Sequence, residues 1–187
     1  MPRDGRIVRE RLQRSALELF TEHGYDGATA GQIAAHAGVT ERTFFRHFPD
    51  KREVLFASEE ELREVLSGAL AAVPPELEAL PTLRRAFHDV VPLLERNRPL
   101  AELRAPVIRA APALRERESA KATALVTLVA EALEKRGVSA RSALLCARVG
   151  MDAFSTAIRR WMTEPSPDLH AEVDEAFEEL RALTGAL

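Results

Sequence analysis

Apolar residues recur at intervals of three and four positions along most of this chain, and no stretch shows the strict alternation of a half-buried strand. The first helix is expected from about Arg6 to His23, where Gly24 can end it. Two shorter helices are expected over residues 30–37 and 41–47. The pattern therefore predicts an all-α fold with three helices in its N-terminal part.

Local signals mark the ends of the two short helices. Thr29 and Gln32 form a capping box at the start of one, and Thr40 caps the other. Gly38 can adopt the left-handed conformation that ends a helix, so the chain can turn sharply there. Pro49 stops the second helix because proline cannot continue its hydrogen-bond ladder. These signals predict a helix-turn-helix unit with a fixed angle.

The rest of the chain also shows helical periodicity. A second capping box at Asp50 and Glu53 predicts a long helix that runs to about Ala72. Pro92 lies inside the next predicted helix and is expected to kink or split it. The later helices are expected over residues 81–97, 99–111, 112–137, 140–163 and 168–183.

The second short helix carries the candidate chemistry. Its apolar side is formed by Phe44, Phe45 and Phe48, and its outward positions are Glu41, Arg42, Thr43 and Arg46. A short, polar, arginine-bearing helix held at a fixed angle fits the major groove of B-DNA. Thr40, His47 and Lys51 stand beside it and can donate hydrogen bonds to phosphate oxygens. An ordinary helical hairpin with a solvated outer face is the alternative interpretation.

Charge adds only weak support for nucleic-acid binding. The formal net charge is −3, while residues 1–51 hold eight Lys and Arg against seven Asp and Glu. Four of those arginines crowd positions 3 to 11, where an N-terminal arm could reach a phosphate backbone. The excess of positive charge is small on average. A small excess lowers the expected affinity for non-specific DNA more than it argues against binding to a specific site.

Other features narrow the class of protein. Cys146 is the single cysteine, which excludes an intramolecular disulfide and disfavours a cysteine-based zinc site, so no metal or cofactor is expected. The polar N-terminus is unlike a signal peptide and no apolar run approaches a membrane span, so we expect a cytoplasmic protein with no membrane partner. The sequence contains no glycine-rich phosphate loop, nucleophile elbow or HExxH motif. An enzyme is therefore not predicted, and a helical protein-interaction module is the main alternative to a DNA-binding protein.

The block G-Y-x-x-A-T-x-x-x-I-A-x-x-A-G-V-T-x-x-T-F-F-x-H-F-x-x-K-x-x-V-L runs from Gly24 to Leu55. It resembles the DNA-binding domain of TetR-family transcriptional regulators. The resemblance implies a helix-turn-helix DNA-binding domain over residues 1–50. It also implies a helical ligand-binding and dimerisation domain over residues 51–187, so that double-stranded DNA is the expected partner.

Residue roles follow from the resemblance position by position. Contacts to base edges are expected from Glu41, Arg42, Thr43 and Arg46, and contacts to phosphates from Thr29, Thr40, His47 and Lys51. Two positions depart from the family pattern. Phe45 replaces a residue that is often tyrosine, so a hydroxyl contact to phosphate is lost, and Gly31 replaces a longer side chain on the first helix of the pair.

The C-terminal part carries two further expectations. The resemblance implies a homodimer that pairs through the last two long helices, so that two recognition helices read a palindromic site. A pocket for a small, largely apolar effector could involve Phe87, His88, Val91, Arg104, Thr123, Thr127, Met151 and Phe154, although plain core packing with solvated polar faces is the better explanation for any one of them. The family tendency is repression, with the effector shifting the dimer away from its DNA-binding state.

Overall fold

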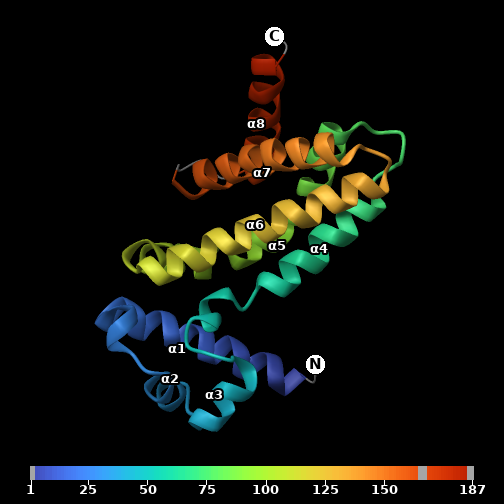
Figure 1. Ribbon diagram of the computed structural model, residues 1–187. Helices are drawn as coiled ribbons and strands as arrows, with labels where there is room; N and C mark the ends of the chain where they lie inside the picture. Colours follow the sequence, from blue (N-terminus) through green and yellow to red (C-terminus); the bar gives the residue numbers. More distant parts are fainter. Residues whose placement is uncertain (1–2, 164–167, 185–187) are drawn as a thin grey trace. The chain divides into compact units, whose positions relative to one another are not determined.

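A computed structural model describes residues 3–163 and 168–184, and every regular element in these ranges is a helix (Figure 1). The helices are α1 (Arg3–Gly27), α2 (Ala30–His36), α3 (Glu41–His47), the 3₁₀ turn η1 (Glu53–Phe56), α4 (Glu59–Ala72), α5 (Ala79–Ala110), α6 (Pro112–Lys135), α7 (Ala140–Thr163) and α8 (Leu169–Thr184). The predicted all-α fold is confirmed. In this part of the chain no helix is both long enough and apolar enough to cross a membrane.

The chain forms two compact units. The first, called here the head unit, comprises residues 1–59 together with 98–119, and the second, the body unit, comprises residues 60–97 together with 120–187. Helices α5 and α6 contribute residues to both units. The head unit therefore contains the corner between α5 and α6 in addition to the N-terminal helices.

The head unit has its own apolar core, and the corner at 98–119 helps to complete it. Leu12 and Phe20 of α1 meet Ile33 of α2 and Phe44 of α3 there. The corner adds four buried side chains to the same core, namely Val107, Ile108, Ala111 and Leu114. A hydrophobic core of this kind stabilises the unit in proportion to the apolar area that it removes from water.

The segment after Pro49 differs from its prediction. Asp50 caps a turn, since its Oδ1 accepts hydrogen bonds from the backbone N–H groups of Arg52 (2.8 Å) and Glu53 (3.0 Å). The turn is the short 3₁₀ helix η1, however, and regular α-helix begins only at Glu59. The single long helix expected from residue 50 to 72 is therefore wrong. Three consecutive apolar side chains explain the break, because η1 buries all of Val54, Leu55 and Phe56.

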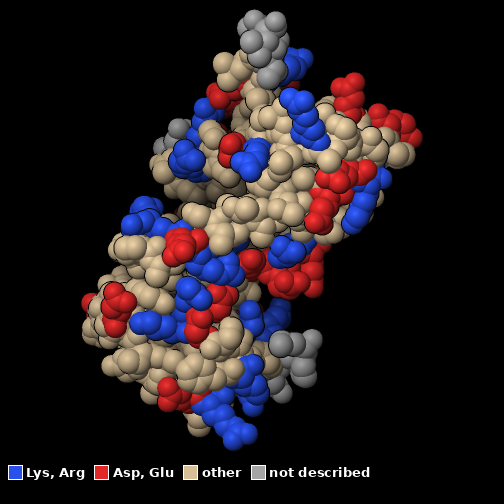
Figure 2. Space-filling model, viewed as in Figure 1, with Lys and Arg blue, Asp and Glu red and all other residues tan. Residues whose placement is uncertain are grey.

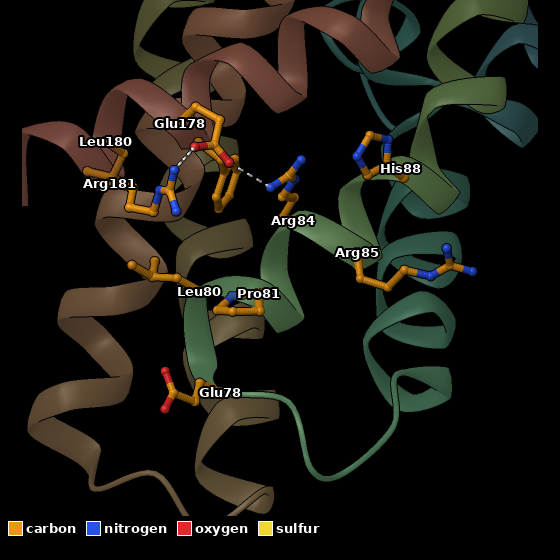
Figure 3. Close-up of a pocket in the computed structure, with 10 residues that line it drawn as sticks. Glu78, Leu80, Pro81, Arg84, Arg85, His88, Glu178, Leu180 and Arg181 are labelled. Carbon is orange, nitrogen blue, oxygen red and sulfur yellow. Dashed lines mark hydrogen bonds and ion pairs between the residues drawn. The ribbon is translucent and has the colours of Figure 1, made fainter.

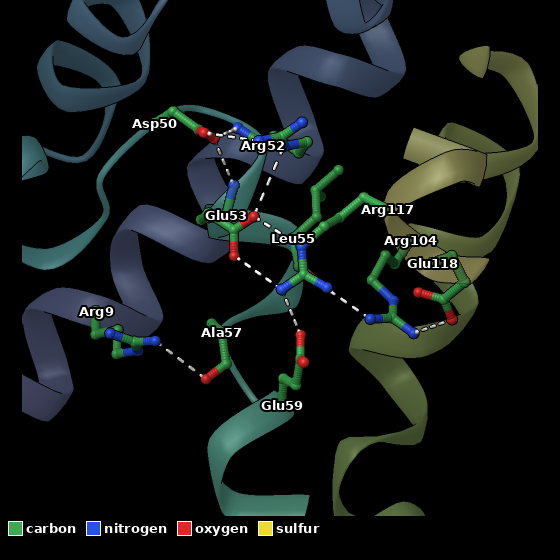
Figure 4. Close-up of polar contacts among 10 residues, drawn as sticks. All are labelled: Arg9, Asp50, Arg52, Glu53, Leu55, Ala57, Glu59, Arg104, Arg117 and Glu118. Atoms are coloured by element: carbon green, nitrogen blue, oxygen red, sulfur yellow. Dashed lines mark hydrogen bonds and ion pairs between the residues drawn. The ribbon is translucent and has the colours of Figure 1, made fainter. Parts of the chain in front are cut away.

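Two arginines of the α5–α6 corner hold η1 (Figure 4). Arg117 donates from Nε and Nη2 to the two carboxylate oxygens of Glu53, at 2.9 and 3.1 Å, and from Nη2 to Glu59 at 2.6 Å. Arg104 donates from Nη1 to the carbonyl oxygen of Leu55 at 3.1 Å. Hydrogen bonding to Glu53 raises the pKa of Arg117, and burial opposes that shift. Both guanidinium groups also lie over the ring of Phe56.

Helix α5 is continuous from Ala79 to Ala110, so a split at Pro92 is excluded, and the boundary expected between residues 97 and 99 is wrong. Its 32 residues correspond to a length of about 48 Å. Pro92, Pro99 and Pro106 lie seven residues apart and are all exposed, so their rings point to solvent on one face of the helix. Pro81 lies in the first turn, where its missing N–H would have no helical partner.

The core of the body unit is built around a stack of aromatic rings. The ring of Phe87 on α5 stacks on that of Phe154 on α7, with centroids 4.2 Å apart and planes inclined by 7°. Phe177 of α8 lies 6.0 Å from the same Phe87 ring. A Cβ at Gly150 of α7 would lie 2.4 Å from Leu83 Cδ1, so any larger residue there would displace the buried Leu83 side chain. Trp161 is buried in the same core.

Candidate nucleic-acid interface

The caps predicted for α2 and α3 are present. Thr29 and Gln32 bond reciprocally, with Thr29 N to Gln32 Oε1 at 2.8 Å and Gln32 N to Thr29 Oγ1 at 3.2 Å. The Oγ1 of Thr40 accepts a hydrogen bond from the Thr43 backbone N–H at 3.2 Å. Gly38 has φ of +67°, the left-handed conformation that the sharp turn requires. The helix-turn-helix predicted from local signals is confirmed.

Helix α3 buries only one side. Phe44 and Phe48 are 0% and 1% exposed, whereas Phe45 is 49% exposed and meets Phe44 edge-on. The expectation that all three phenylalanines pack inward is therefore wrong for Phe45. Positions 44 and 48 share a face of the helix, and position 45 lies about 100° away. A strict count of helical period could have found this exposed aromatic residue.

The outward side chains of α3 differ in how far they contact other residues of the head unit. Arg42 and Arg46 are exposed. Glu41 is exposed too, but its carboxylate leans on α2, within 3.5–3.6 Å of the place where a Cβ on Gly31 would lie. The Thr43 hydroxyl is hydrogen-bonded to the Thr40 hydroxyl at 3.0 Å. The two arginines are thus the charged groups on α3 best placed to reach a ligand, and Figure 2 shows basic side chains at the surface where α2 and α3 lie.

Lys51 makes contacts inside the head unit. Its Nζ donates to the carbonyl oxygens of Tyr25 (2.8 Å) and Ala28 (3.1 Å), and it lies 4.2 Å from the centroid of the Tyr25 ring. Tyr25 lies in the last residues of α1, just after the non-helical Gly24, and Ala28 lies between α1 and α2. Lys51 therefore ties the end of α1 to the start of α2 in this conformation.

His47 also turns inward. Both of its ring nitrogens are buried and have no hydrogen-bond partner in the described part of the chain. Burial lowers the pKa of His47, and the nearby charges of Arg46 and Arg9 lower it further. The structure therefore does not place these ring nitrogens where they could donate to a phosphate, although the side chain as a whole is half-buried.

Two of the arginines near the N-terminus are bonded to carbonyl groups of the head unit. Arg9 donates to the carbonyl oxygens of His47 and Ala57, both at 3.2 Å, and stacks over the ring of Phe48. Arg11 donates to the carbonyl oxygen of Ala37. Both carbonyls that end a short helix, at His47 and Ala37, thus receive a cationic donor, which is favourable at a helix C-terminus. Of the arginines at positions 3 to 11, Arg9 and Arg11 therefore stabilise the fold of the head unit.

The eight residues suggested for an effector site do not come together. Phe87, Val91, Met151 and Phe154 belong to the core of the body unit. The remaining four lie in other surroundings: Thr123 and Thr127 are exposed, Arg104 belongs to the head unit, and His88 lines a pocket at the surface of the body unit. Sequence periodicity identified core positions here, and it could not identify the residues of α8 that line this pocket.

The capped helix pair, with its left-handed glycine and its two exposed arginines, defines a helix-turn-helix protein of the kind that places a short helix in DNA. Residues 13–58 match the sequence profile of bacterial regulatory proteins of the tetR family, and residues 77–184 match that of the MftR C-terminal domain. Because the second match covers more than half of the chain, the chain belongs to the TetR family of bacterial regulatory proteins.

Individual relatives agree with this assignment. The transcriptional regulator TcmR of Streptomyces glaucescens is 40% identical over 86 residues, which is 46% of this chain and 38% of TcmR. The regulator HbdR of Aromatoleum sp. (strain CIB) is 34% identical over 91 residues, or 46% of this chain and 38% of HbdR. The chain therefore spans less than half the length of both curated relatives.

A solved structure covers more of the chain. FadR of Thermus thermophilus, described as a TetR-family transcriptional repressor in complex with lauroyl-CoA, is 27% identical. The match covers 92% of this chain and 93% of that one, with a TM-score of 0.56. The likeness therefore extends through the head unit and the body unit.

Proposed function

We propose that this protein is a DNA-binding transcriptional repressor whose dimer binds a palindromic operator and releases it when a small, largely apolar effector binds. The observation that carries the proposal is α3, a capped helix of seven residues that exposes Arg42 and Arg46. Membership of the TetR family and the likeness to a repressor solved with an acyl-CoA support the same function.

Within this proposal α3 enters the major groove. Arg42 and Arg46 contact base edges, with Glu41 and Thr43 as further readers and Phe45 as an apolar contact to a thymine methyl group or a sugar. The hydroxyls of Thr29 and Thr40 contact phosphates. His47 and Lys51 do not contact DNA in this proposal. Their polar atoms are buried, or bonded to backbone carbonyls, inside the head unit.

The DNA-binding proposal is tested by selecting bound duplexes from a random pool and then replacing Arg42. We expect an enriched palindrome whose half-sites lie about one helical turn apart. Arg42→Ala should weaken binding to that duplex by roughly 5- to 150-fold, while the helical content stays unchanged. The matched control is Arg96→Ala, a 61% exposed arginine of α5 in the body unit. A pool without any enriched duplex would contradict the proposal.

The dimer is proposed to form through α7 and α8. Leu144 and Leu145 of α7 are 43% and 63% exposed and adjacent in sequence, so together they offer apolar surface that a second copy of the chain could cover. Leu145→Asp should therefore give a monomer in sedimentation equilibrium. Leu103→Asp, which changes a 48% exposed leucine of α5, is the control that should leave the dimer intact. A monomeric wild-type protein at micromolar concentration would refute this part.

A further inference from the structure

The body unit has a surface pocket of which the sequence suggested only one lining residue, His88. It has a volume of about 420 Å³ and opens between the first turns of α5 and the second half of α8 (Figure 3). Leu80, Pro81 and Phe177 supply apolar walls, and Leu180 adds to them. A volume of this size lies within the range of small-molecule sites. The pocket can therefore hold a ligand with an apolar body.

The rim of the pocket is rich in arginine. Arg84, Arg85 and Arg181 line it, against Glu78 and Glu178. Glu178 is already paired with two of these arginines, since its carboxylate lies 3.2 Å from Arg84 Nη1 and 2.7 Å from Arg181 Nη2. Arg85 is 63% exposed, and its ion pair with Asp89 is long, at 4.0 Å. Arg85 is thus held more loosely by its acidic neighbour than the other two arginines are by theirs.

The position of Glu178 indicates what the rim can hold. Its carboxylate lies between two guanidinium groups beside the apolar wall (Figure 3). A carboxylate supplied by a ligand could replace Glu178 at Arg84, because guanidinium groups bind carboxylates by charge-assisted hydrogen bonds. Arg85 is the rim arginine whose own ion pair is long. We propose that this pocket binds a small organic carboxylate whose charge is held by Arg84 and Arg85 and whose apolar body lies against Leu80 and Phe177. The inference rests on the proposed function, in which such a ligand is the effector.

Occupation of the pocket would act on α8. Arg84 Nε bonds Asp174 at 2.8 Å and Arg84 Nη1 bonds Glu178, so this one arginine of α5 connects to two acids of α8. His88 adds contacts of 2.8 Å to both Asp174 and His170. A ligand carboxylate competes with Glu178 for Arg84 and so weakens one of these connections. Because α8 belongs to the proposed dimer interface, the pocket is placed to influence pairing.

Charge selectivity is the first test, measured by isothermal titration calorimetry on the full chain with octanoate, octylammonium and octanol as probes. Octanoate should bind about tenfold more tightly than octylammonium. Arg85→Gln should weaken octanoate binding by about fivefold, while Arg96→Gln, at a 61% exposed arginine farther along α5, should leave it unchanged. Equal affinity for the two charged probes, or an equal effect of both substitutions, would overturn the proposal.

The second test asks whether Glu178 competes with the ligand. Glu178→Gln should strengthen octanoate binding by about threefold because it releases Arg84 and Arg181, whereas Glu175→Gln on the exposed side of α8 should not. A weakened affinity in Glu178→Gln would contradict competition and overturn the assignment. Thermal melting of each variant shows that the fold is retained.

Two further outcomes separate the pocket from its alternatives. Octanoate affinity that falls as the protein concentration rises would show that a second copy of the chain fills the pocket, and it would overturn the proposal. Selective duplex binding without a preference for octanoate would support the proposed function and overturn the carboxylate site. Octanoate binding as expected, without any preferred duplex, would instead overturn the proposed function and support the carboxylate site.

Discussion

Gly38 shows how one backbone conformation sets the geometry of the reading helix. Its φ of +67° lies in the left-handed region, and a Cβ at this position would lie 2.9 Å from Nη2 of Arg11. The same Arg11 donates to the carbonyl oxygen of Ala37, so the guanidinium cannot move away without losing that bond. The backbone conformation therefore favours glycine, and a Cβ would in addition displace the Arg11 guanidinium.

We expect Gly38→Ala to lower the free energy of unfolding by about 1–2 kcal/mol, the cost of a left-handed conformation for a residue with a Cβ. Gly68→Ala is the control, since Gly68 is an exposed helical glycine and a Cβ added there would meet nothing within 4 Å. That change should raise the free energy of unfolding by about 0.5–1 kcal/mol. Urea denaturation followed by circular dichroism measures both, and effects of the same sign would contradict this account.

His47 makes the stability of the head unit depend on pH. Burial lowers the pKa of its imidazole in the folded protein below the ordinary value of about 6.5. Between the two values the unfolded chain binds a proton that the folded chain does not, so stability is complete above about pH 6.5 and falls as the pH drops below it. Unfolding measured between pH 5 and 8 should show this loss.

A substitution that cannot titrate isolates the contribution of His47. His47→Gln should flatten the pH dependence, because glutamine binds no proton in this range. His36→Gln is the matched control, because it replaces an exposed imidazole on the same unit. An unchanged slope in His47→Gln would show that other groups carry the effect.

At the scale of elements, the 3₁₀ turn η1 depends on its ion pairs for its position. Arg117, Glu53 and Glu59 are only 22%, 23% and 16% exposed in their side chains, and the Arg117–Glu53 contact is bidentate. Hydrogen bonds to charged groups that are partly shielded from water contribute more than exposed pairs do. The ion pairs of Arg117 with Glu53 and Glu59 therefore stabilise the position of η1 more than an exposed ion pair would.

A double-mutant cycle on Arg117→Met and Glu53→Gln should give a coupling energy of about 1.5–3 kcal/mol in urea denaturation. The same cycle on the exposed pair Arg96 and Glu61, at 61% and 51% exposure, should give only about 0.2–1 kcal/mol. Equal coupling energies for the two pairs would show that the partial burial of Arg117 and Glu53 does not strengthen their interaction.

At the scale of the whole molecule, the head unit is not a contiguous stretch of sequence. Its core includes Val107, Ile108, Ala111 and Leu114, which lie about 50 residues beyond η1. A fragment that ends at residue 58 would leave the side chains facing this corner exposed to water. The helix-turn-helix is therefore expected to depend on the α5–α6 corner for its stability.

We expect residues 1–58 alone to show no cooperative thermal transition by circular dichroism. In the full chain, Leu114→Ala should lower the free energy of unfolding by about 2–5 kcal/mol, because Leu114 is fully buried. Leu103→Ala, at a 48% exposed position of the same corner, should change it by less than about 0.5 kcal/mol. A fragment that melts as cooperatively as the full chain would refute the dependence.

Features that rest on neighbours three or four positions away could be predicted from the amino-acid sequence. The caps at Thr29 and Thr40 and the turn at Gly38 were predictable because their donors and acceptors lie within one helical turn. The all-α fold followed from periodicity in the same way. The inward side of α3 was predictable for Phe44 and Phe48, which share one helical face.

Features that depend on partners distant in sequence required the folded chain. Lys51 and Arg9 looked available from sequence, and their engagement with backbone carbonyls 23 to 48 residues away is visible only in the structure. The same holds for η1, whose position depends on Arg117, and for the pocket, whose walls come from α5 and α8. A local pattern records which face of a helix is apolar, whereas only the packed fold decides which residues that face will meet.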